Sequence, residues 1–572
     1  MRRSVVLMTL CCLGGCASGP QRAPSDTYDW VLRGGTVYDG SGAPGRVTDL
    51  GIRGDRVAAV GDLATASAAH TLDARGLAVA PGFINMLSWA PDALMEDGRS
   101  LGDVKQGVTL EIFGEGWSYG PYSAWLKEDV KKQQYDIVYD ITWTTLGEFL
   151  DQLVARGVSP NVASFVGATT LRQHALQNED RAPTPQELAR MQELARQAMD
   201  EGALGLGASL IYAPAFYAKT DELTALARAV GESGGGYIAH LRSEGPRLLE
   251  ALDELIAIAR EADVHAEVYH LKAAGQENWP KMAQAIARIE EARAAGLSIA
   301  ADMYVYTAGA TGLDASMPPW VQEGGIDAWV ERLKDPAIRA RVLAEMRSGT
   351  DAWENLGRMA GSPERILFLG FKNPALKPLT GKTLAEVAAG RGTSPEDTMI
   401  DLVVENHARV ETAYFLMSED NVRLGIRQPW VTFGSDAESA VPEGVFLRSS
   451  SHPRAYGNFA KLLGRYVREE KLISLPEAIH RLTGLPAERW KLRERGCLAA
   501  GCFADVVVFD PATIQDHATY ERPQQFATGV RDVLVNGVPV IRDGQHTGAR
   551  PGRVVRGPGW CGWRPGGCGG PS

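Results

Sequence analysis

Residues 236–270 read GYIAHLRSEGPRLLEALDELIAIAREADVHAEVYH, and this stretch decides the fold class. An apolar run ends at His240, a helical segment covers residues 245–261, and a second apolar run ends at His270. A strand, a helix and a strand in this order build parallel strands with helices outside them. Over the length of the chain, this alternation favours an α/β protein with a TIM-like (β/α)8 barrel over an open sheet. The same pattern predicts further strands at 162–166, 298–304 and 430–433 and further helices at 185–201, 221–233 and 279–295.

Both ends of the chain show a different pattern, made of short apolar runs broken by turns. It fills residues 28–80 and returns at 488–552, with a Gly-Asp pair at 54–55 that is typical of a hairpin. We expect the two ends to build one small β-sandwich domain, with residues 81–487 forming the barrel between them. From about 314 to 368 the rhythm breaks into a segment rich in Pro, Trp and charge. This segment is predicted to be an inserted, lid-like subdomain at the barrel mouth.

The composition is that of a globular protein. The chain has 572 residues, of which 45% are hydrophobic and 23% are charged. Its formal net charge of -11 argues against a nucleic-acid partner. The three glycines at 234–236 precede a strand rather than a helix, so they do not form a phosphate-binding loop.

The N-terminus has the pattern of an export signal. Basic residues at 2–3 precede a short apolar run at 5–13, which is too short to span a bilayer. The run ends in Leu13-Gly14-Gly15-Cys16, which resembles a bacterial lipobox. The resemblance implies a signal peptide at 1–15, lipidation of Cys16 and a tether at 16–27; an ordinary secretory signal is the alternative. We therefore expect an exported protein, lipid-anchored to the outer membrane and facing the periplasm of a Gram-negative bacterium.

Four cysteines further along the chain than Cys16 bear on the same question. They are Cys497, Cys502, Cys561 and Cys568, and an exported protein could pair them as disulfides. The last two lie in residues 553–572, a segment rich in Gly, Pro and Trp without periodicity. We expect this segment to be a disordered tail.

Three polar residues end apolar runs of the predicted barrel. They are His240, His270 and Asp436, and catalytic groups of such barrels sit at the C-terminal ends of the strands. Each one alone could be a structural residue, but the three together in this order indicate a functional site.

Several motifs resemble the D-aminoacylase branch of the amidohydrolase superfamily, the N-acyl-D-amino-acid deacylases, over roughly residues 28–552. This resemblance implies a metal-dependent amide hydrolase. The motifs are Pro81-Gly82-Phe83-Ile84, Ile211-Tyr212-Ala213-Pro214, Ala239-His240-Leu241-Arg242-Ser243-Glu244, His270-Leu271-Lys272, Phe415-Leu416-Met417-Ser418-Glu419-Asp420, Gly434-Ser435-Asp436 and His452-Pro453-Arg454.

The chain departs from the family pattern at two places. Most members carry His-x-His after the first barrel strand, where this chain has Leu87 and Trp89, and neither side chain can ligate zinc. In place of the ligating cysteine of the branch stands Glu115, in a segment one residue shorter. Glu115, His240 and His270 would make three protein ligands and leave one position open for water, as a catalytic zinc requires. We expect one zinc ion, with Leu87 and Trp89 as the apolar floor of its site.

The resemblance also assigns roles to residues around the metal. Asp436 is predicted to accept the proton of the attacking water and pass it to the leaving amine. Lys272, Arg454 and Tyr212 are implied as contacts of a substrate carboxylate, although ion pairing or packing would also explain them. A further family contact, usually serine, reads Gly309 or nearby here.

These features predict hydrolysis of a linear amide bond in a small molecule with a free carboxylate. The expected substrate is an N-acyl-D-amino acid or a small peptide with a D residue. A dipeptidase and a cyclic-amide hydrolase of the same superfamily stay open as alternatives. So does a catalytically inactive relative that only binds ligand, for which Leu87 and Trp89 are the evidence. The sequence does not select an oligomeric state.

Overall fold

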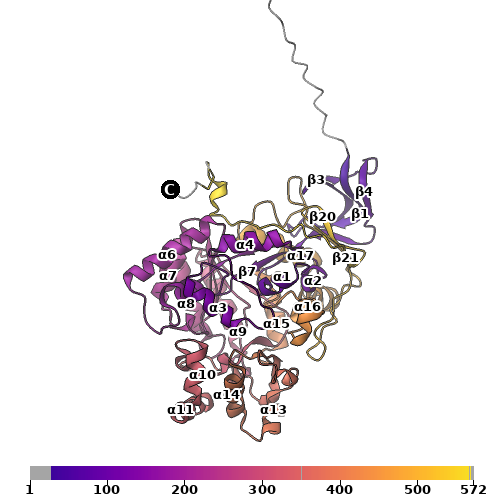
Figure 1. The fold of residues 1–572 in the computed structure, drawn as a ribbon. Coiled ribbons are helices and arrows are strands. Elements are labelled where there is room, and N and C mark those ends of the chain that lie inside the picture. Colours follow the sequence, from indigo (N-terminus) through magenta and orange to yellow (C-terminus); the bar gives the residue numbers. More distant parts are fainter. Residues whose placement is uncertain (1–26, 350, 566, 569–572) are drawn as a thin grey trace, which may run out of the picture.

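The central element of the fold is a closed barrel of parallel strands. The computed structural model describes residues 27–349, 351–565 and 567–568 (Figure 1). Within these residues eight strand positions follow one another around the barrel, and β8 and β9 share one position because only Phe165 separates them. The barrel closes between its last and first strands, where the Met86 N–H donates to the Phe433 carbonyl at 3.2 Å. The strands are β6 (Phe83–Asn85), β7 (Val108–Phe113), β8 (Asn161–Ser164), β9 (Val166–Gly167), β10 (Gly205–Ser209), β11 (Gly236–His240), β12 (Ala266–Val268), β13 (Ile299–Met303) and β17 (Val431–Phe433).

Amphipathic helices cover the outside of this barrel. In α8 (Leu248–Ala262) the buried residues recur every three or four positions, which places one apolar stripe against the strands. α6 (Pro185–Asp200) begins with a capping box between Thr184 and Glu187, so its sequence fixes where it starts. The barrel prediction is thereby confirmed. The other covering helices include α4 (Leu146–Arg156), α5 (Ala168–Leu176), α7 (Thr220–Gly231), α9 (Lys281–Ala294), α15 (Glu419–Ile426) and α17 (Leu475–Leu482).

The barrel interior is a packed apolar core. Side chains from successive strands fill it, and Trp490 closes one end by packing edge-on against Phe165, with ring centroids 4.6 Å apart. Because the interior is filled, a catalytic site must lie at an end of the barrel, and in barrels of this kind it lies at the C-terminal end. The core residues include Ile84, Met86, Leu87, Leu110, Ile112, Ile238 and Tyr269.

The two chain ends meet in one nine-stranded sheet, as the sequence predicted. The long strand β1 (Tyr28–Val37) pairs with β4 along its first half and with β5 along its second, so it joins the two parts of the domain. Trp30, Leu50, Ile52 and Val506 lie in the domain's own apolar core. The other strands are β2 (Arg46–Arg53), β3 (Arg56–Gly61), β4 (Ala68–Asp73), β5 (Ala78–Pro81), β18 (Val506–Phe509), β19 (Val530–Val535), β20 (Val538–Arg542) and β21 (Gln545–His546).

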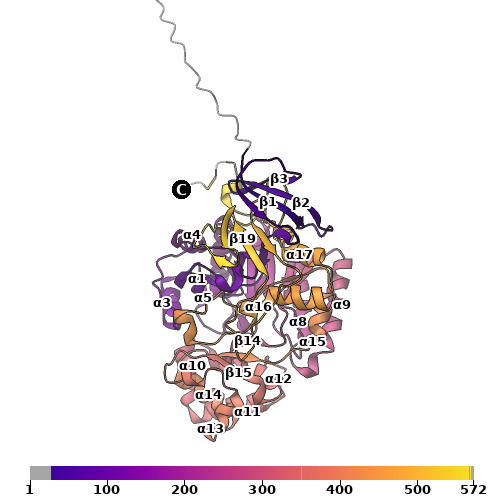
Figure 2. The same ribbon diagram turned by 90° about the vertical axis from the view of Figure 1, so that its right-hand side faces the viewer.

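The inserted subdomain is longer than predicted. It lies between β13 and β17 and contains an antiparallel sheet in the order β14-β16-β15, so the predicted range of about 314–368 covers only its first half. The later half alternates helices and strands, which explains why its sequence resembles barrel repeats. Figures 1 and 2 place it at the opposite end of the barrel from the β-sandwich domain. Its elements are β14 (Gly309–Gly312), α10 (Ile326–Lys334), α11 (Pro336–Arg347), α12 (Leu356–Met359), β15 (Ile366–Gly370), α13 (Leu384–Arg391), α14 (Pro395–Asn406) and β16 (Glu411–Tyr414).

The prediction that residues 553–572 form a disordered tail is wrong for the first part of this segment. The backbone of residues 553–555 pairs with β8, where the Val555 N–H donates to the Val162 carbonyl at 2.8 Å. These bonds need no side-chain periodicity, so the pattern of the sequence could not reveal them. Within the described residues the cysteines form two disulfides, Cys497–Cys502 and Cys561–Cys568.

Two findings concern the membrane. The predicted signal, Cys16 and most of the tether lie outside the described residues. Across the described part of the chain, every helix is too short or too polar to cross a bilayer.

A buried ion pair near Trp490 leads to a stability prediction. Glu267 on β12 is completely buried and pairs with Arg489 of α18 (Gly484–Arg489), with 2.7 Å between Nε and Oε2. Arg489→Met leaves this carboxylate without its cation, so we expect a loss of about 3–5 kcal/mol in unfolding free energy. Arg288→Met, which breaks an exposed pair with Asp253, should cost at most about 1 kcal/mol. Urea unfolding measures both, and equal losses would contradict the prediction.

Candidate metal and catalytic site

Three predicted metal ligands converge at the C-terminal end of the barrel. Glu115 follows β7 after a turn at Gly114, whose φ of +104° and close approach to Phe165 exclude a side chain. His240 is the last residue of β11, and His270 lies two residues beyond β12. All three side chains are buried. The barrel therefore brings together residues that are 125 and 155 positions apart.

The geometry of these side chains suits a metal ion. Glu115 Oε1 lies 3.1 Å from His240 Nδ1 and 2.9 Å from His270 Nε2. One ligand atom from each residue falls within 4.8 Å of the others, the spread that three ligands around one ion produce. Two imidazoles and a carboxylate are a ligand set of catalytic zinc.

The charges of the cluster also favour a bound metal ion. Burial would raise the pKa of Glu115, but His270 and His240 outweigh it and hold the pKa at about 2. Burial and Lys272 lower the pKa of His270. Glu244 and Glu115 raise it by more than this, so the pKa is about 10. Without a metal ion, the ionised carboxylate of Glu115 is therefore compensated by the positive charge of a protonated His270. A metal ion would supply that charge in place of the proton, because ligand imidazoles are neutral.

Glu244 is a residue of the site that the sequence interpretation missed. Its Oε1 lies 3.0 Å from His270 Nδ1, which leaves Nε2 of the same ring facing Glu115. A carboxylate behind a histidine ligand orients the ring and raises its basicity. The sequence signals were its position four residues after His240 and its place at the end of the motif Ala239-His240-Leu241-Arg242-Ser243-Glu244. Lys272 is drawn into the same group, with Nζ 2.5 Å from Glu244 Oε1 and 2.7 Å from His270 Nδ1.

Asp436 faces the cluster from the end of β17. Its φ of +51° is left-handed, and its backbone N–H donates to the Leu87 carbonyl at 2.8 Å. Such strained positions gather at functional sites when surrounding contacts hold them. Burial raises the pKa of Asp436, and Arg454 opposes that rise from 2.7 Å away.

Trp89 corrects the expectation of an apolar floor. Its indole N–H donates to Glu115 Oε2 and to Asp436 Oδ1, both at 3.1 Å. Leu87, by contrast, is buried in the barrel core as expected. Glu111, four residues before Glu115, accepts hydrogen bonds from Ser88 and Ser100.

The predicted substrate contacts surround this centre. Arg454 is the first residue of α16 (Arg454–Lys461), and its guanidinium lies 4.4 Å from the centre of the Tyr304 ring. Tyr212 packs against His240, with ring centroids 5.4 Å apart, and the guanidinium of Arg409 in the inserted subdomain lies 5.1 Å from the centre of the Tyr212 ring.

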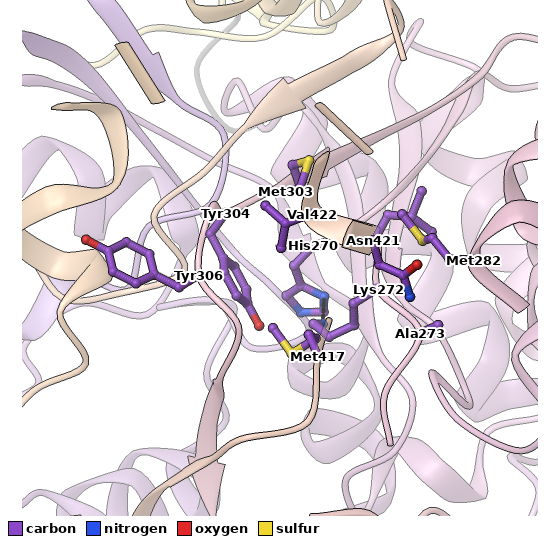
Figure 3. A pocket seen from close by; sticks show the side chains of 11 residues that line it. His270, Lys272, Ala273, Met282, Met303, Tyr304, Tyr306, Met417, Asn421 and Val422 are labelled. Atoms are coloured by element: carbon purple, nitrogen blue, oxygen red, sulfur yellow. Dashed lines mark hydrogen bonds between the residues drawn. The ribbon is translucent and has the colours of Figure 1, made fainter. Parts of the chain in front are cut away.

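A small pocket adjoins the centre on the side of His270 and Lys272. Figure 3 shows Tyr304, Tyr306 and Met417 around it, with the imidazole of His270 between Tyr304 and Lys272. Its walls are largely apolar and come from the segments that follow β12 and β13, from α9, and from α15 with the segment before it. The lining residues are His270, Leu271, Lys272, Ala273, Met282, Met303, Tyr304, Tyr306, Met417, Asn421 and Val422.

Known proteins share this architecture. Residues 70–541 match the model of the amidohydrolase family. The D-aminoacylase of Alcaligenes xylosoxydans xylosoxydans is 35% identical over 535 residues, which cover 93% of this chain and 99% of that protein. A solved D-aminoacylase structure aligns with a TM-score of 0.76 at 33% identity, covering 92% of this chain and 100% of its own. That enzyme has a binuclear metal centre, in which one metal activates and the second attenuates. The N-acyl-D-glutamate deacylase of Bordetella bronchiseptica, complexed with zinc and a phosphonate mimic of the tetrahedral intermediate, aligns at 0.75 and 32% identity, covering 93% and 100%.

The ligand cluster makes a testable prediction about metal content. We expect His240→Ala, His270→Ala and Glu115→Ala to lose bound zinc, because each removes one of three protein ligands. Glu244→Gln should weaken zinc binding by roughly 10–100-fold, the usual effect of losing a partner that orients a ligand. Mass spectrometry of the purified protein measures the metal. His407→Ala, which removes an exposed histidine paired with Asp327, is the control, and equal zinc in all variants would refute the assignment.

Proposed function

The chain belongs to the amidohydrolase family, and we propose that it is a metal-dependent hydrolase of N-acyl-D-amino acids that works with a single zinc ion. The observation that carries the proposal is the cluster of Glu115, His240 and His270, with Asp436 held beside it by Trp89. Relatives that align with 92–93% of the chain are named D-aminoacylase, N-acyl-D-aspartate deacylase and N-acyl-D-glutamate deacylase. This cluster also argues against an inactive relative, since a ligand-binding protein has no need of three convergent metal ligands.

Glu115, His240 and His270 would hold the ion. When bound, zinc supplies a Lewis acid for the amide carbonyl and lowers the pKa of water. Asp436 accepts the proton of the attacking water and then donates it to the leaving nitrogen. Arg454 keeps Asp436 in place through its contact with Oδ2, and Oδ1 is held by Trp89. The proton is therefore carried by a carboxylate whose two oxygens are both oriented.

Arg454, Lys272 and Tyr212 are proposed to bind the substrate carboxylate. Nε of Arg454 is buried and has no hydrogen-bond partner among the described residues, so the guanidinium keeps donor capacity. Lys272 donates to Glu244, and an ammonium has three donors, so it keeps donor capacity. The buried Tyr304 hydroxyl also has no partner among the described residues, and the Arg454 guanidinium lies over the ring of the same residue. These unused donors suit an anionic, open-chain substrate.

A single ion follows from the residues at the end of β6. Leu87 and Trp89 stand where two further ligands would be needed, and neither provides a lone pair for zinc. In the D-aminoacylase described above, one metal activates and the second attenuates. One ion is therefore compatible with catalysis in this family.

The function is tested by a hydrolysis screen over matched N-acetyl-D- and N-acetyl-L-amino acids and dipeptides. We expect zinc-loaded protein to release amino acid from the D series. Asp436→Asn should keep its zinc and lose roughly 10²–10⁴-fold in kcat, because proton transfer is lost while the ligands stay. Hydrolysis of dipeptides alone would redirect the proposal, and unchanged turnover by the variant would remove Asp436 from the mechanism.

We further propose that the protein is exported and anchored through lipid on Cys16. The pairing of all four described cysteines supports this, since disulfides persist in oxidising compartments. Fractionation of a Gram-negative host is expected to place the protein in the outer membrane. The Cys16→Ser variant should move to the soluble fraction, and retention in the membrane would refute the lipid anchor.

A further inference from the structure

The backbone that carries Trp89 is clamped between two barrel strands. The Ser88 N–H donates to the Ile112 carbonyl at 2.9 Å, and the Trp89 N–H donates to the Ala437 carbonyl at 3.0 Å. Leu87 accepts from the Asp436 N–H on the same side. Both neighbours of this segment are thus the strand ends that carry Glu115 and Asp436. These bonds hold in place the backbone from which the indole projects.

A buried polar network fixes the same segment from behind. Ser88 Oγ donates to Glu111 Oε2 at 2.6 Å and accepts from the Ala90 N–H at 3.1 Å. On the other strand the Ser435 N–H donates to Asn85 Oδ1 at 2.8 Å, one residue before Asp436. The residues next to Trp89 and Asp436 are therefore both held by buried hydrogen bonds, which fixes this donor and this acceptor relative to the barrel.

The indole N–H bridges two carboxylates that belong to different parts of the reaction. Glu115 turns Oε1 toward the two imidazoles and Oε2 toward Trp89, while Asp436 turns Oδ2 toward Arg454 and Oδ1 toward Trp89. Indole nitrogen is a donor only and has no lone pair for a metal. It therefore engages one oxygen of each carboxylate and offers no ligand to a second cation at this position.

We propose that Trp89 is a positioning residue that replaces a second metal ion: it bridges Glu115 and Asp436 by hydrogen bonds and limits the centre to one ion. This inference rests on the proposed single-metal hydrolase. Leu87 completes the exclusion, because its side chain is buried in the barrel core and offers no ligand at the neighbouring position. Because the bridge is neutral, the charge of Asp436 is balanced by Arg454 rather than by a metal.

The first test counts metal ions. Wild-type protein dialysed against excess zinc is expected to retain one ion per chain by mass spectrometry, and Trp89→Phe should also retain one, because phenylalanine adds no ligand. The Leu87→His/Trp89→His double variant should retain two. Two ions in the wild type, or one in the double variant with its fold intact by circular dichroism, would overturn the proposal.

The second test separates positioning from packing. Trp89→Phe keeps most of the ring and loses the N–H, so Asp436 loses a donor that favours its ionised form. The pKa of Asp436 then rises, and the acid limb of the kcat/KM profile should move to higher pH, with kcat falling more than KM changes. Trp117→Phe is the matched control, because Trp117 donates to Gln173 rather than to a carboxylate and packs on Tyr212.

The outcomes keep the two proposals apart. A Trp89→Phe profile that coincides with those of wild type and Trp117→Phe would refute the positioning role. If Trp89→Phe does not fold, the ion counts of the wild type and the double variant decide alone. If none of the N-acyl amino acids is hydrolysed but the ion counts are one and two, the proposed function fails while the replacement of the second metal stands.

Discussion

The ionised carboxylate of Glu115 is the constraint on which the site depends. It is 4% exposed, and a buried charge must be compensated by hydrogen bonds or by a cation. Two imidazoles approach one of its oxygens and one indole N–H approaches the other. These three groups come from the ends of three different strands. The charge is therefore met only when the barrel is closed, which couples the folding of the barrel to the assembly of the metal site.

Around this centre the other charges are arranged in pairs. Arg454 faces Asp436, and Lys272 faces Glu244, which in turn orients His270. Each pair is buried, where an unpaired charge would be costly. Asp436 and Glu244 thus each have a cation of their own, whereas Glu115 is met by the two imidazoles and the indole. The left-handed backbone at His270 and Asp436 indicates that this arrangement is held against local preference.

The limits of prediction can be traced to particular residues. His240 and Asp436 were recognisable because polar residues that end apolar runs stand out in a barrel pattern. Glu244 was missed because its role depends on the ring that it faces, which belongs to another strand. Trp89 was assigned to an apolar floor because composition alone does not show where an N–H points. The inserted subdomain was drawn too short because its second half alternates helix and strand as the barrel does. The pairing of residues 553–555 with β8 was not predicted because main-chain hydrogen bonds do not depend on the side-chain pattern.

The sequence by itself determined the barrel, the union of the chain ends in one domain and the choice of Glu115, His240 and His270 as candidate ligands. Periodicity and strand-end polarity are local properties, and each is written in a few neighbouring residues. Only the tertiary structure decided which atoms meet. Trp89 and Asp436 are 347 residues apart, and His270 and Glu115 are 155 apart, so closure of the barrel alone sets their distances. For that reason the absent His-x-His pair indicated a lost metal position in the sequence, whereas the structure revealed a hydrogen-bond donor at one of its two positions.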